Sequence, residues 1–417
     1  MNESNILHCD LNNFFASVEC VKNNEYYNVP MIVCGDPKLR HGIVLAKNNI
    51  AKKYGIITGE TIYSARKKCP NLVLASSNYD DYIKYSNLVN QIYLKYTNKV
   101  EPLSIDECFL DVSESVMLFG DSIKIANLIK EDVKKSTGLT ISVGVSFNKS
   151  FAKIGSDMKK TDAVTVIDYT NFKRILYPQD VSILMSIGKT TKPILNKYGI
   201  NTVGDLAHFN LDKLRKILGN KADEIYNIVK GNLIDEVKNF NCLNIPKSVS
   251  KGNTFSMDEN DIEFLEKNVN DLCEKVSENL RRYKLKATVI CLGIKDSNFI
   301  TITRQKHIKA TNTYGDIAKL ATEILKENYD LNKKIRSLTV FANNLVSNEE
   351  DNQLNLFNNK KIENIYLEKT NTLNNDKVLK SKKQDELNNV IDKLKARFGE
   401  NSITYASTSN LKNERKK

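Results

Sequence analysis

Two short segments carry carboxylates in settings where carboxylates are unusual. Asp106 and Glu107 are adjacent within an apolar, strand-like stretch, residues 104–111. Neighbouring carboxylates cannot neutralise each other, and a divalent cation relieves the cost of placing them together. A third acid, Asp10, follows the apolar run of residues 6–9. Three carboxylates on two strands suit Mg²⁺-dependent phosphoryl transfer, in which two metal ions hold the attacking and leaving oxygens.

Five segments with strand or helix periodicity surround these acids and predict a mixed α/β fold, with helices covering one face of a sheet. They are strands at residues 72–75, 100–112 and 139–145, and helices at residues 80–93 and 123–135. Gly138 follows the second helix, and a glycine commonly ends a helix in this position. In the first helix, one apolar stripe is expected to face the core, at positions 82, 85, 88, 89 and 92.

The acid pair also predicts a local irregularity in its strand. Successive side chains of a regular strand point to opposite faces, so Asp106 and Glu107 would be separated. Both reach one metal site only at a strand end or at a distorted turn, and we predict such a break here. Asp111 is the nearest rival acid, and we expect it to hydrogen-bond locally.

The rest of the folded chain divides into three further regions. Residues 43–60 run from a strand into a helix that stops at Gly55. Residues 168–241 are helical throughout, and residues 186–191 are typical of a helix-hairpin-helix, whose glycine turn offers backbone N–H groups to a phosphate. A plain helical turn is the alternative for this segment. Residues 246–346 alternate two helices with strands.

Beyond residue 346 the chain becomes polar but contains one apolar string, Gln353-Leu354-Asn355-Leu356-Phe357. Apolar residues in a polar linker have nothing of their own to pack on, so the groove of a partner protein would explain them. A short buried strand is the alternative. Residues 385–398 then predict a basic amphipathic helix.

The composition is that of a globular protein whose 417 residues suffice for two to four domains. A formal net charge of +12 suits a nucleic-acid partner, although codon bias in an AT-rich genome would also enrich lysine. The eight cysteines are scattered without a Cys-x-x-Cys pair, so we expect reduced thiols and no zinc site. No apolar run reaches the length of a membrane span, and residues 1–5 do not begin a signal peptide, so a cytoplasmic protein without a membrane partner is expected.

The two acidic segments resemble the catalytic motifs of Y-family translesion DNA polymerases, most closely those of the bacterial DNA polymerase IV branch. The segments are residues 9–19, CDLNNFFASVE, and residues 104–107, SIDE, and the resemblance extends over nearly the whole chain. It implies template-directed, error-prone addition of deoxynucleoside triphosphates (dNTPs) to a primer 3′ end, past damaged bases. It also implies a right-hand α/β architecture with a palm at residues 1–168, fingers inserted at about 20–72, a helical thumb at 169–241, a little finger at 246–346, and a clamp-binding linker and basic helical tail at 347–417.

The resemblance also implies roles for individual residues. Asp10, Asp106 and Glu107 would be catalytic and would hold two Mg²⁺ ions, with help from the backbone carbonyl of Leu11. Phe15 would be the steric gate that excludes a 2′-hydroxyl. The other implied contacts are with nucleotide (Phe14, Phe15, Ala46, Asn49, Lys52, Lys160), with primer-template DNA (Gly188, Lys189, Arg304) and with the β subunit of the sliding clamp (Gln353, Leu354, Leu356, Phe357). Core packing is the alternative for Phe15 and the preferred interpretation of Phe14. The enzyme would act as a monomer.

The chain departs from the family pattern at several of these positions. Asn49 and Lys52 stand where tyrosine and arginine are more common, and lysine supplies charge without the bidentate fork of arginine. Ser186 stands where the helix-hairpin-helix usually has a second glycine. Lys159 is an alternative to Lys160 for the triphosphate.

Three other functions share part of this pattern. A polymerase V-type catalytic subunit would have the same motifs but would need accessory proteins, so activity of the purified chain alone separates it. An inactive relative could serve as a clamp-binding adaptor, but it would be expected to lack the acids. A nucleotide cyclase also has a palm with paired acids, but the thumb-like and little-finger-like regions argue against it.

Overall fold

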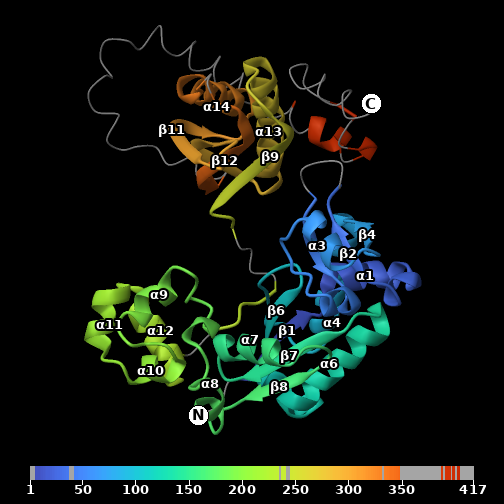
Figure 1. Ribbon diagram of the computed structural model, residues 1–417, viewed down its shortest axis with the longest axis vertical. Coiled ribbons are helices and arrows are strands. Elements are labelled where there is room, and N and C mark those ends of the chain that lie inside the picture. Colours follow the sequence, from blue (N-terminus) through green and yellow to red (C-terminus); the bar gives the residue numbers. More distant parts are fainter. Residues whose placement is uncertain are drawn as a thin grey trace, which may run out of the picture. The chain divides into compact units, whose positions relative to one another are not determined.

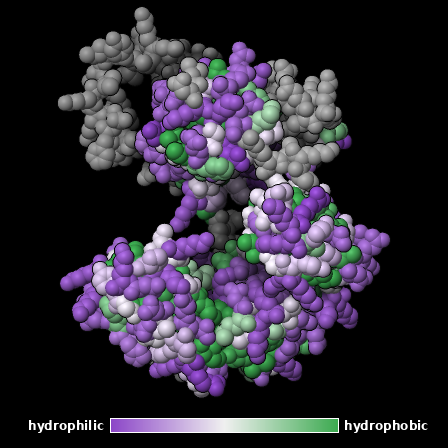
Figure 2. Space-filling model, in the orientation of Figure 1, coloured by the Kyte–Doolittle hydropathy of each residue, from purple (hydrophilic) through white to green (hydrophobic). Residues whose placement is uncertain are grey.

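The computed structural model describes residues 5–36, 42–233, 236–240, 245–330 and 333–347, together with residues 387, 390–395, 397–399, 402 and 403. The chain forms two compact units, Met1–Leu243 and Asn244–Lys417 (Figure 1). Polar and charged residues cover most of the visible surface of both units (Figure 2). Within the described ranges, none of the helices has the length and apolar character needed to cross a membrane.

A five-stranded sheet forms the centre of the first unit. Its strands, in spatial order, are β5 (Val100–Pro102), β6 (Glu107–Asp111), β1 (Ile6–Leu11), β7 (Ile141–Ser146) and β8 (Val164–Ile167). β1 lies in the middle and pairs antiparallel with β6 and β7, whereas β8 runs parallel to β7. The segment 100–112, predicted as one strand, is instead two antiparallel strands, because the chain turns between β5 and β6.

Helices cover both faces of this sheet, so the prediction of a single covered face was wrong. One face packs against three helices, α1 (Phe14–Lys22), α4 (Tyr79–Tyr93) and α6 (Ser122–Thr137). On β1, Leu7, Cys9 and Leu11 belong to their common core. The alternate residues, including Asp10, face the other side, where α7 (Lys149–Met158) packs on β1, β7 and β8. All six residues of β1 are buried as a result.

The helices of the first face follow the predicted pattern with one exception. Tyr82, Val89 and Ile92 of α4 are buried, but Leu88 is 46% exposed, contrary to prediction. A helix turns by about 100° per residue, which places Leu88 at the edge of the apolar stripe instead of in its centre. Gly138 ends α6 as predicted, in the left-handed conformation with φ of 73°.

The contact between α7 and the sheet depends on Gly144 in β7. A Cβ atom added at Gly144 would lie 1.8 Å from the backbone oxygen of Ala152 and 2.6 Å from the backbone nitrogen of Ser156. Any side chain at this position would therefore force the helix away from the sheet. Gly144 thus allows α7 to bring its own side chains close to the ends of β1 and β6.

A second sheet of the first unit has three strands. Its order is β3 (Val44–Lys47), β2 (Met31–Cys34) and β4 (Val73–Ser76), and α2 (Asn49–Lys53) and α3 (Ile62–Lys68) share its core. The strand at 72–75 was predicted to belong with the segments of the central sheet, but β4 pairs with β2 instead. Periodicity identifies a strand without naming its neighbour, which explains this error. Gly55, with φ of 71°, follows α2 in the turn, as predicted.

The other helices of the first unit gather around a core of their own. They are α8 (Phe172–Leu176), α9 (Thr191–Asn196), α10 (Val203–His208), α11 (Leu211–Leu218) and α12 (Lys221–Lys230). Gly188 lies in the loop before α9, and Gly199, with φ of 79°, lies in the turn after it. Four short elements complete the described part of the unit, η1 (Asn24–Tyr27), η2 (Ser113–Ser115), α5 (Val116–Phe119) and η3 (Val181–Ile183).

The second unit is a four-stranded antiparallel sheet with two helices packed on it, as the alternation in residues 246–346 predicts. The strand order is β11 (Thr301–Thr311), β10 (Leu285–Asp296), β12 (Ile335–Ser347) and β9 (Ser248–Glu259), and the helices are α13 (Ile262–Arg282) and α14 (Tyr314–Asn328). Apolar residues of both helices and of the sheet form one core. β11 and β9 are therefore the two edge strands.

A helical segment of the C-terminal region, residues 390–395, is held on α13 by ion pairs. The Lys395 ammonium lies 2.6 Å from a carboxylate oxygen of Glu274 and also pairs with Glu278. Arg281 donates two hydrogen bonds, each 2.8 Å long, to the carboxylate of Asp392. Part of the predicted amphipathic helix thus packs on the second unit through charged groups.

Replacing Lys395 with alanine is expected to lower the free energy of unfolding of the full chain by about 1–3 kcal/mol, because an almost buried carboxylate loses a charged partner. Lys395 is 8% exposed and Glu274 is 4% exposed, so water screens the pair only weakly. Chemical denaturation measures the change. Lys393→Ala, at an exposed position of the same segment, is the control and should leave stability unchanged. Equal stability of the two variants would contradict the docking contact.

Candidate active site

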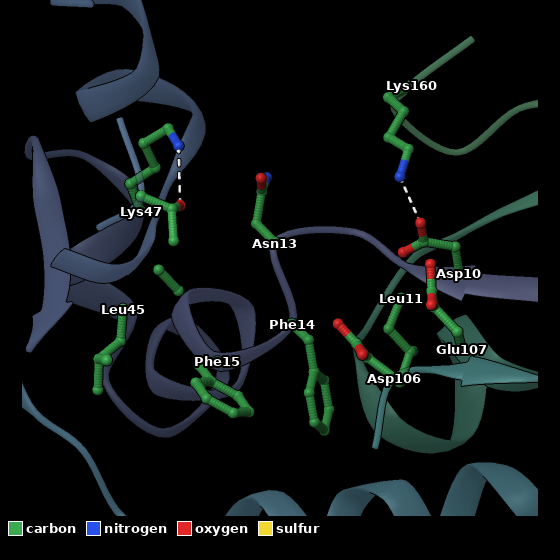
Figure 3. Close-up of a pocket in the computed structure, with 12 residues that line it drawn as sticks. Asp10, Leu11, Asn13, Phe14, Phe15, Leu45, Lys47, Asp106, Glu107 and Lys160 are labelled. Atoms are coloured by element: carbon green, nitrogen blue, oxygen red, sulfur yellow. Dashed lines mark hydrogen bonds and ion pairs between the residues drawn. The ribbon is translucent and has the colours of Figure 1, made fainter. Parts of the chain in front are cut away.

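A cavity of about 300 Å³ opens at the end of β1 (Figure 3). Eight of the predicted site residues line it: Asp10, Leu11, Phe14, Phe15, Ala46, Asp106, Glu107 and Lys160. Four further residues also line it, Asn13, Leu45, Lys47 and Thr58. The three acids therefore share one cavity despite their separation in the sequence.

The pairing of β1 with β6 places the acids together. Asp10 lies directly opposite Glu107 in the antiparallel register, so both side chains emerge on the same face of the sheet. β6 begins only at Glu107, and Asp106 precedes it in the turn, so the predicted break is confirmed. The N–H of Leu11 donates to the carbonyl of Asp106 at 3.0 Å, which ties this turn to the end of β1.

Lysines hold two of the three carboxylates. Lys160 pairs with Asp10 and also lies 2.9 Å from Asp157, whereas Lys153 of α7 pairs with Glu107. Burial raises the pKa of Asp10 above its usual value, and the Lys160 ammonium offsets part of that rise. Two positive charges thus compensate the acids on the face of the sheet that α7 covers.

Lys153 is a site residue that sequence reasoning missed. It belongs to α7, a helix in which most of the neighbouring residues are buried, including Ala152 and Ile154. A lysine flanked by buried residues needs a nearby anion, and that was the available signal.

Asp106 differs from the other acids, because it accepts a 2.6 Å hydrogen bond from the Ser104 hydroxyl.

The N-terminus of α1 faces the cavity through Asn13. This residue has a left-handed backbone, with φ of 50°, and its side chain does not cap the helix. The Asn13 amide donates instead to Asn49 at 2.9 Å. The first N–H groups of α1 are consequently left without a side-chain cap beside the cavity, where the positive end of the helix dipole favours an anion such as phosphate.

An aromatic cluster holds Phe15 at the cavity wall. Its ring stacks on Tyr82, with centroids 4.1 Å apart and planes 10° from parallel. Tyr79 meets the Phe15 ring edge-on at 5.6 Å. Phe14 is 3% exposed and belongs to the core of the first unit. Phe15 is therefore a fixed apolar surface, and Phe14 contributes mainly to packing.

Comparison with known sequences assigns this arrangement to a family. The sequence models of the impB/mucB/samB family and of its C-terminal domain match residues 9–157 and 246–356. A DNA polymerase IV of Acetivibrio thermocellus is 40% identical over 399 residues, which cover 95% of this chain and 96% of the relative. A DNA polymerase IV of Clostridium acetobutylicum is 35% identical, over 82% of this chain and 87% of the relative. This chain belongs to the Y-family of DNA polymerases.

Solved structures agree with the family assignment. A chimaera of the Y-family polymerases Dbh and Dpo4 matches with a TM-score of 0.74 at 25% identity, over 82% of this chain and 100% of the chimaera. An insertion ternary complex of Dbh polymerase matches with a TM-score of 0.60 at the same identity and coverage. The chain is therefore a translesion polymerase of the DNA polymerase IV type, a DNA-directed DNA polymerase with palm, fingers and thumb and a C-terminal β-rich domain.

The acids of this Y-family polymerase fit a divalent metal, on which the family generally depends. Among the described residues, no three His, Cys, Asp or Glu side chains are already gathered as a ligand set. Asp10 and Glu107 instead have ammonium groups as counter-charges. A divalent cation prefers carboxylate oxygens and would replace an ammonium as their counter-charge. The donor set thus suits Mg²⁺ once the lysines are displaced.

The predicted triphosphate contacts lie at different places in the polymerase. Lys160 lines the cavity, whereas Asn49 and Lys52 do not. Lys52 is exposed on α2, and Asn49 bonds to Asn13 at the rim. Lys47 enters the cavity from β3 instead, beside Leu45 and Ala46, and no signal in the sequence distinguished it from Lys52.

The remaining predicted contacts of the polymerase are outside this cavity. Lys189 is exposed in the loop before α9, next to Gly188. Arg304 is exposed on the edge strand β11, where its guanidinium donates to the carbonyl of Thr303 at 3.0 Å. The clamp-binding string, Gln353, Leu354, Leu356 and Phe357, lies outside the described residues.

Proposed function

We propose that this polymerase extends a primer 3′ end with dNTPs, directed by a template, through two-metal phosphoryl transfer at the described cavity. The meeting of Asp10, Asp106 and Glu107 at one end of that cavity carries the proposal. Phosphoryl transfer needs in-line positioning and neutralisation of negative charge more than covalent chemistry. Grouped carboxylates beside positive groups are what that requirement predicts.

Asp10, Asp106 and Glu107 would hold the two Mg²⁺ ions with their carboxylates, and Leu11 would offer its backbone carbonyl. The bound ions would lower the pKa of the primer 3′-hydroxyl and neutralise charge on the phosphate being transferred. Lys160 would then be released from Asp10 and become available to the triphosphate. Lys153 would likewise give up its ion pair with Glu107, whose carboxylate would then be free for the metal.

The nucleotide would be held by groups on the wall between the acids and the second sheet. The N–H groups at the start of α1 offer hydrogen bonds to phosphate oxygens. Phe15, fixed by its stacking on Tyr82, would lie under the deoxyribose and leave no room for a 2′-hydroxyl. Leu45 and Ala46 would meet the base pair, because both line the cavity on the side of β3.

Primer-template DNA would be held by the helical region and the C-terminal unit. Gly188 and Lys189 lie in a loop suited to a DNA phosphate, and Arg304 projects from an edge strand. The neighbouring structure of Dbh polymerase, an insertion ternary complex, supports DNA and nucleotide as ligands of the fold. The proposed domain limits are those of the sequence analysis, with the palm at 1–168, the thumb at 169–241 and the little finger at 246–346.

The apolar string at residues 353–357 would recruit the enzyme to the sliding clamp. Its apolar residues lie in a polar segment, which suits a partner groove and not an internal core. In this proposal the enzyme acts in the cytoplasm, as a monomer on clamp-bound DNA.

Primer extension by the purified full chain tests both parts of the proposal. With Mg²⁺, dNTPs and an undamaged template, the chain alone should extend a primer, and chelation of the metal should stop extension. Loaded clamp should increase the amount of product per binding event. The double variant Leu356→Ala and Phe357→Ala should lose this stimulation and keep the extension seen without clamp.

Each arm has an outcome that contradicts it. Absence of extension by the wild-type chain would favour the polymerase V-type or adaptor functions over the proposed one. Extension that persists after metal removal would exclude the two-metal mechanism. Unchanged clamp stimulation in the double variant would remove residues 353–357 from clamp binding while leaving the polymerase assignment in place.

A further inference from the structure

Lys47 is a cation on the cavity wall that takes no part in the proposed reaction at the acids. It lies at the end of β3, and both Lys47 and Leu45 line the cavity. Lys47 and Lys160 stand on opposite sides of the cavity, with Asn13 between them (Figure 3). The two lysines thus flank the start of α1, where an anion is favoured.

Lys47 has no ion-pair partner among the described residues, although the charge of Glu60 offsets part of the effect of burial on its pKa. Its ammonium donates a 3.2 Å hydrogen bond to the Thr58 hydroxyl, and no carboxylate among the described residues forms an ion pair with it. The nearest acid, Glu60, is already engaged by Lys68 at 2.8 Å, by the N–H of Ile57 at 2.8 Å and by the Ser64 hydroxyl at 2.7 Å. Lys47 is therefore a charged donor with spare hydrogen-bonding capacity.

This placement has an energetic cost that an anionic ligand would offset. Lys47 is half-buried, and burial together with the charge of Lys52 lowers its pKa below the usual value. A second charge in the same cavity wall would compensate it in the way that Lys153 and Lys160 are compensated by acids. The three acids of the cavity lie on the opposite side, so an anionic ligand is the group that would supply this second charge.

We propose that Lys47 binds the terminal phosphates of the incoming dNTP, from the side of the cavity opposite Lys160. This inference rests on the proposed polymerase function, which places the reacting phosphate beside Asp10 and Asp106. A triphosphate that starts at the acids and passes the N-terminus of α1 leads toward Lys47. Lys47 then supplies charge from the fingers, the role that the family resemblance suggested for Lys52.

Nucleotide binding without chemistry tests this assignment. A primer ending in a dideoxynucleotide forms a complex with the full chain, template and Mg²⁺, and the dissociation constants of the matching dNTP and dNMP are then measured. Lys47→Ala and Lys47→Gln should weaken dNTP binding by about 10- to 100-fold, because a charge-assisted hydrogen bond is lost. Binding of the dNMP should change by no more than about twofold, since it lacks the terminal phosphates. Lys47→Arg should restore dNTP affinity.

Lys52 and Lys53, both in α2, complete the design. Lys53→Ala, at an exposed position, is the matched control and should bind dNTP like the wild type. Wild-type affinity in Lys47→Ala, a loss in Lys52→Ala alone, or an equal loss of dNTP and dNMP affinity would each overturn the assignment. A wild-type chain that extends primers while these results are found would leave the polymerase function intact. A wild-type chain that neither binds dNTP nor extends a primer would instead overturn the proposed function, and this inference with it.

Discussion

Asp106→Ala is expected to reduce the rate of primer extension by about 10³-fold or more with Mg²⁺ as the metal. Asp106 lies in the turn before β6 and lines the same cavity as Asp10 and Glu107. In the proposed mechanism Asp106 would hold metal at the site, so its loss would remove charge stabilisation that exists mainly in the transition state. Single-turnover extension under saturating dNTP measures the chemical step without interference from DNA release.

A neighbouring acid provides the control for this experiment. Asp111 is the last residue of β6, and its carboxylate accepts hydrogen bonds from the N–H and hydroxyl of Ser113 at 3.0 and 2.6 Å and pairs with Lys99 at 3.5 Å. Asp111→Asn should therefore extend primers at close to the wild-type rate. DNA affinity should be similar in both variants, which separates loss of chemistry from loss of binding. If Asp106→Ala retained a rate within tenfold of wild type, Asp106 would not be a metal ligand.

Phe15→Ala is expected to raise ribonucleotide incorporation relative to deoxyribonucleotide incorporation on the order of 10²-fold. The Phe15 ring is held at the cavity wall between Tyr82 and Tyr79, so it cannot move aside when a 2′-hydroxyl approaches. Removing the ring opens space for that hydroxyl. The ratio of the specificity constants kcat/KM for the ribo- and deoxynucleotide measures the effect.

Two variants make this result specific to the ring. Phe15→Tyr keeps the planar ring and should keep discrimination against ribonucleotides. Phe14→Leu removes an aromatic ring from the buried core next to the site, and it should lower stability without changing the choice of sugar. The steric-gate role is excluded if Phe15→Ala shows the same ribonucleotide ratio as the wild type.

The lysine–carboxylate pairs suggest why metal binding and nucleotide binding would be coupled in this enzyme. Lys160 pairs with Asp10 in the described state and is also the predicted ligand of the triphosphate. A metal held by Asp10 would leave the Lys160 ammonium available to the phosphates, and phosphate bound to Lys160 would leave the Asp10 carboxylate available to the metal. Binding of the metal would thus lower the free-energy cost of binding the nucleotide, and the reverse, through the Lys160 side chain.

Local features of the site were evident from the amino-acid sequence. The adjacency of Asp106 and Glu107 required a strand break, because alternation would otherwise send them to opposite faces, and β6 does begin at Glu107. Gly138 ends α6, and the helix and strand periods located most elements of both units. These properties depend on neighbouring residues, whose geometry is set by bond angles, hydrogen-bond periods and side-chain alternation.

Partner choice between distant segments was decided only by the tertiary structure. β4 has the periodicity of a strand, but its own sequence does not indicate that it pairs with β2 and not with the central sheet. The covering of the second sheet face by α7 depends on the absence of a side chain at Gly144, and that cover brings Lys153 to Glu107. Lys47, which lines the cavity, and Lys52, which does not, are equally plausible cations in the sequence.

The sequence by itself therefore determined the chemistry of this protein: three acids in two strand-like segments, an aromatic residue beside one of them, and a family of enzymes to which both motifs point. The tertiary structure alone decided which positive charges neutralise those acids and which line the cavity. The physical reason is that periodicity sets the direction of a side chain within its own strand or helix. Packing across long loops, in contrast, sets which element lies opposite it.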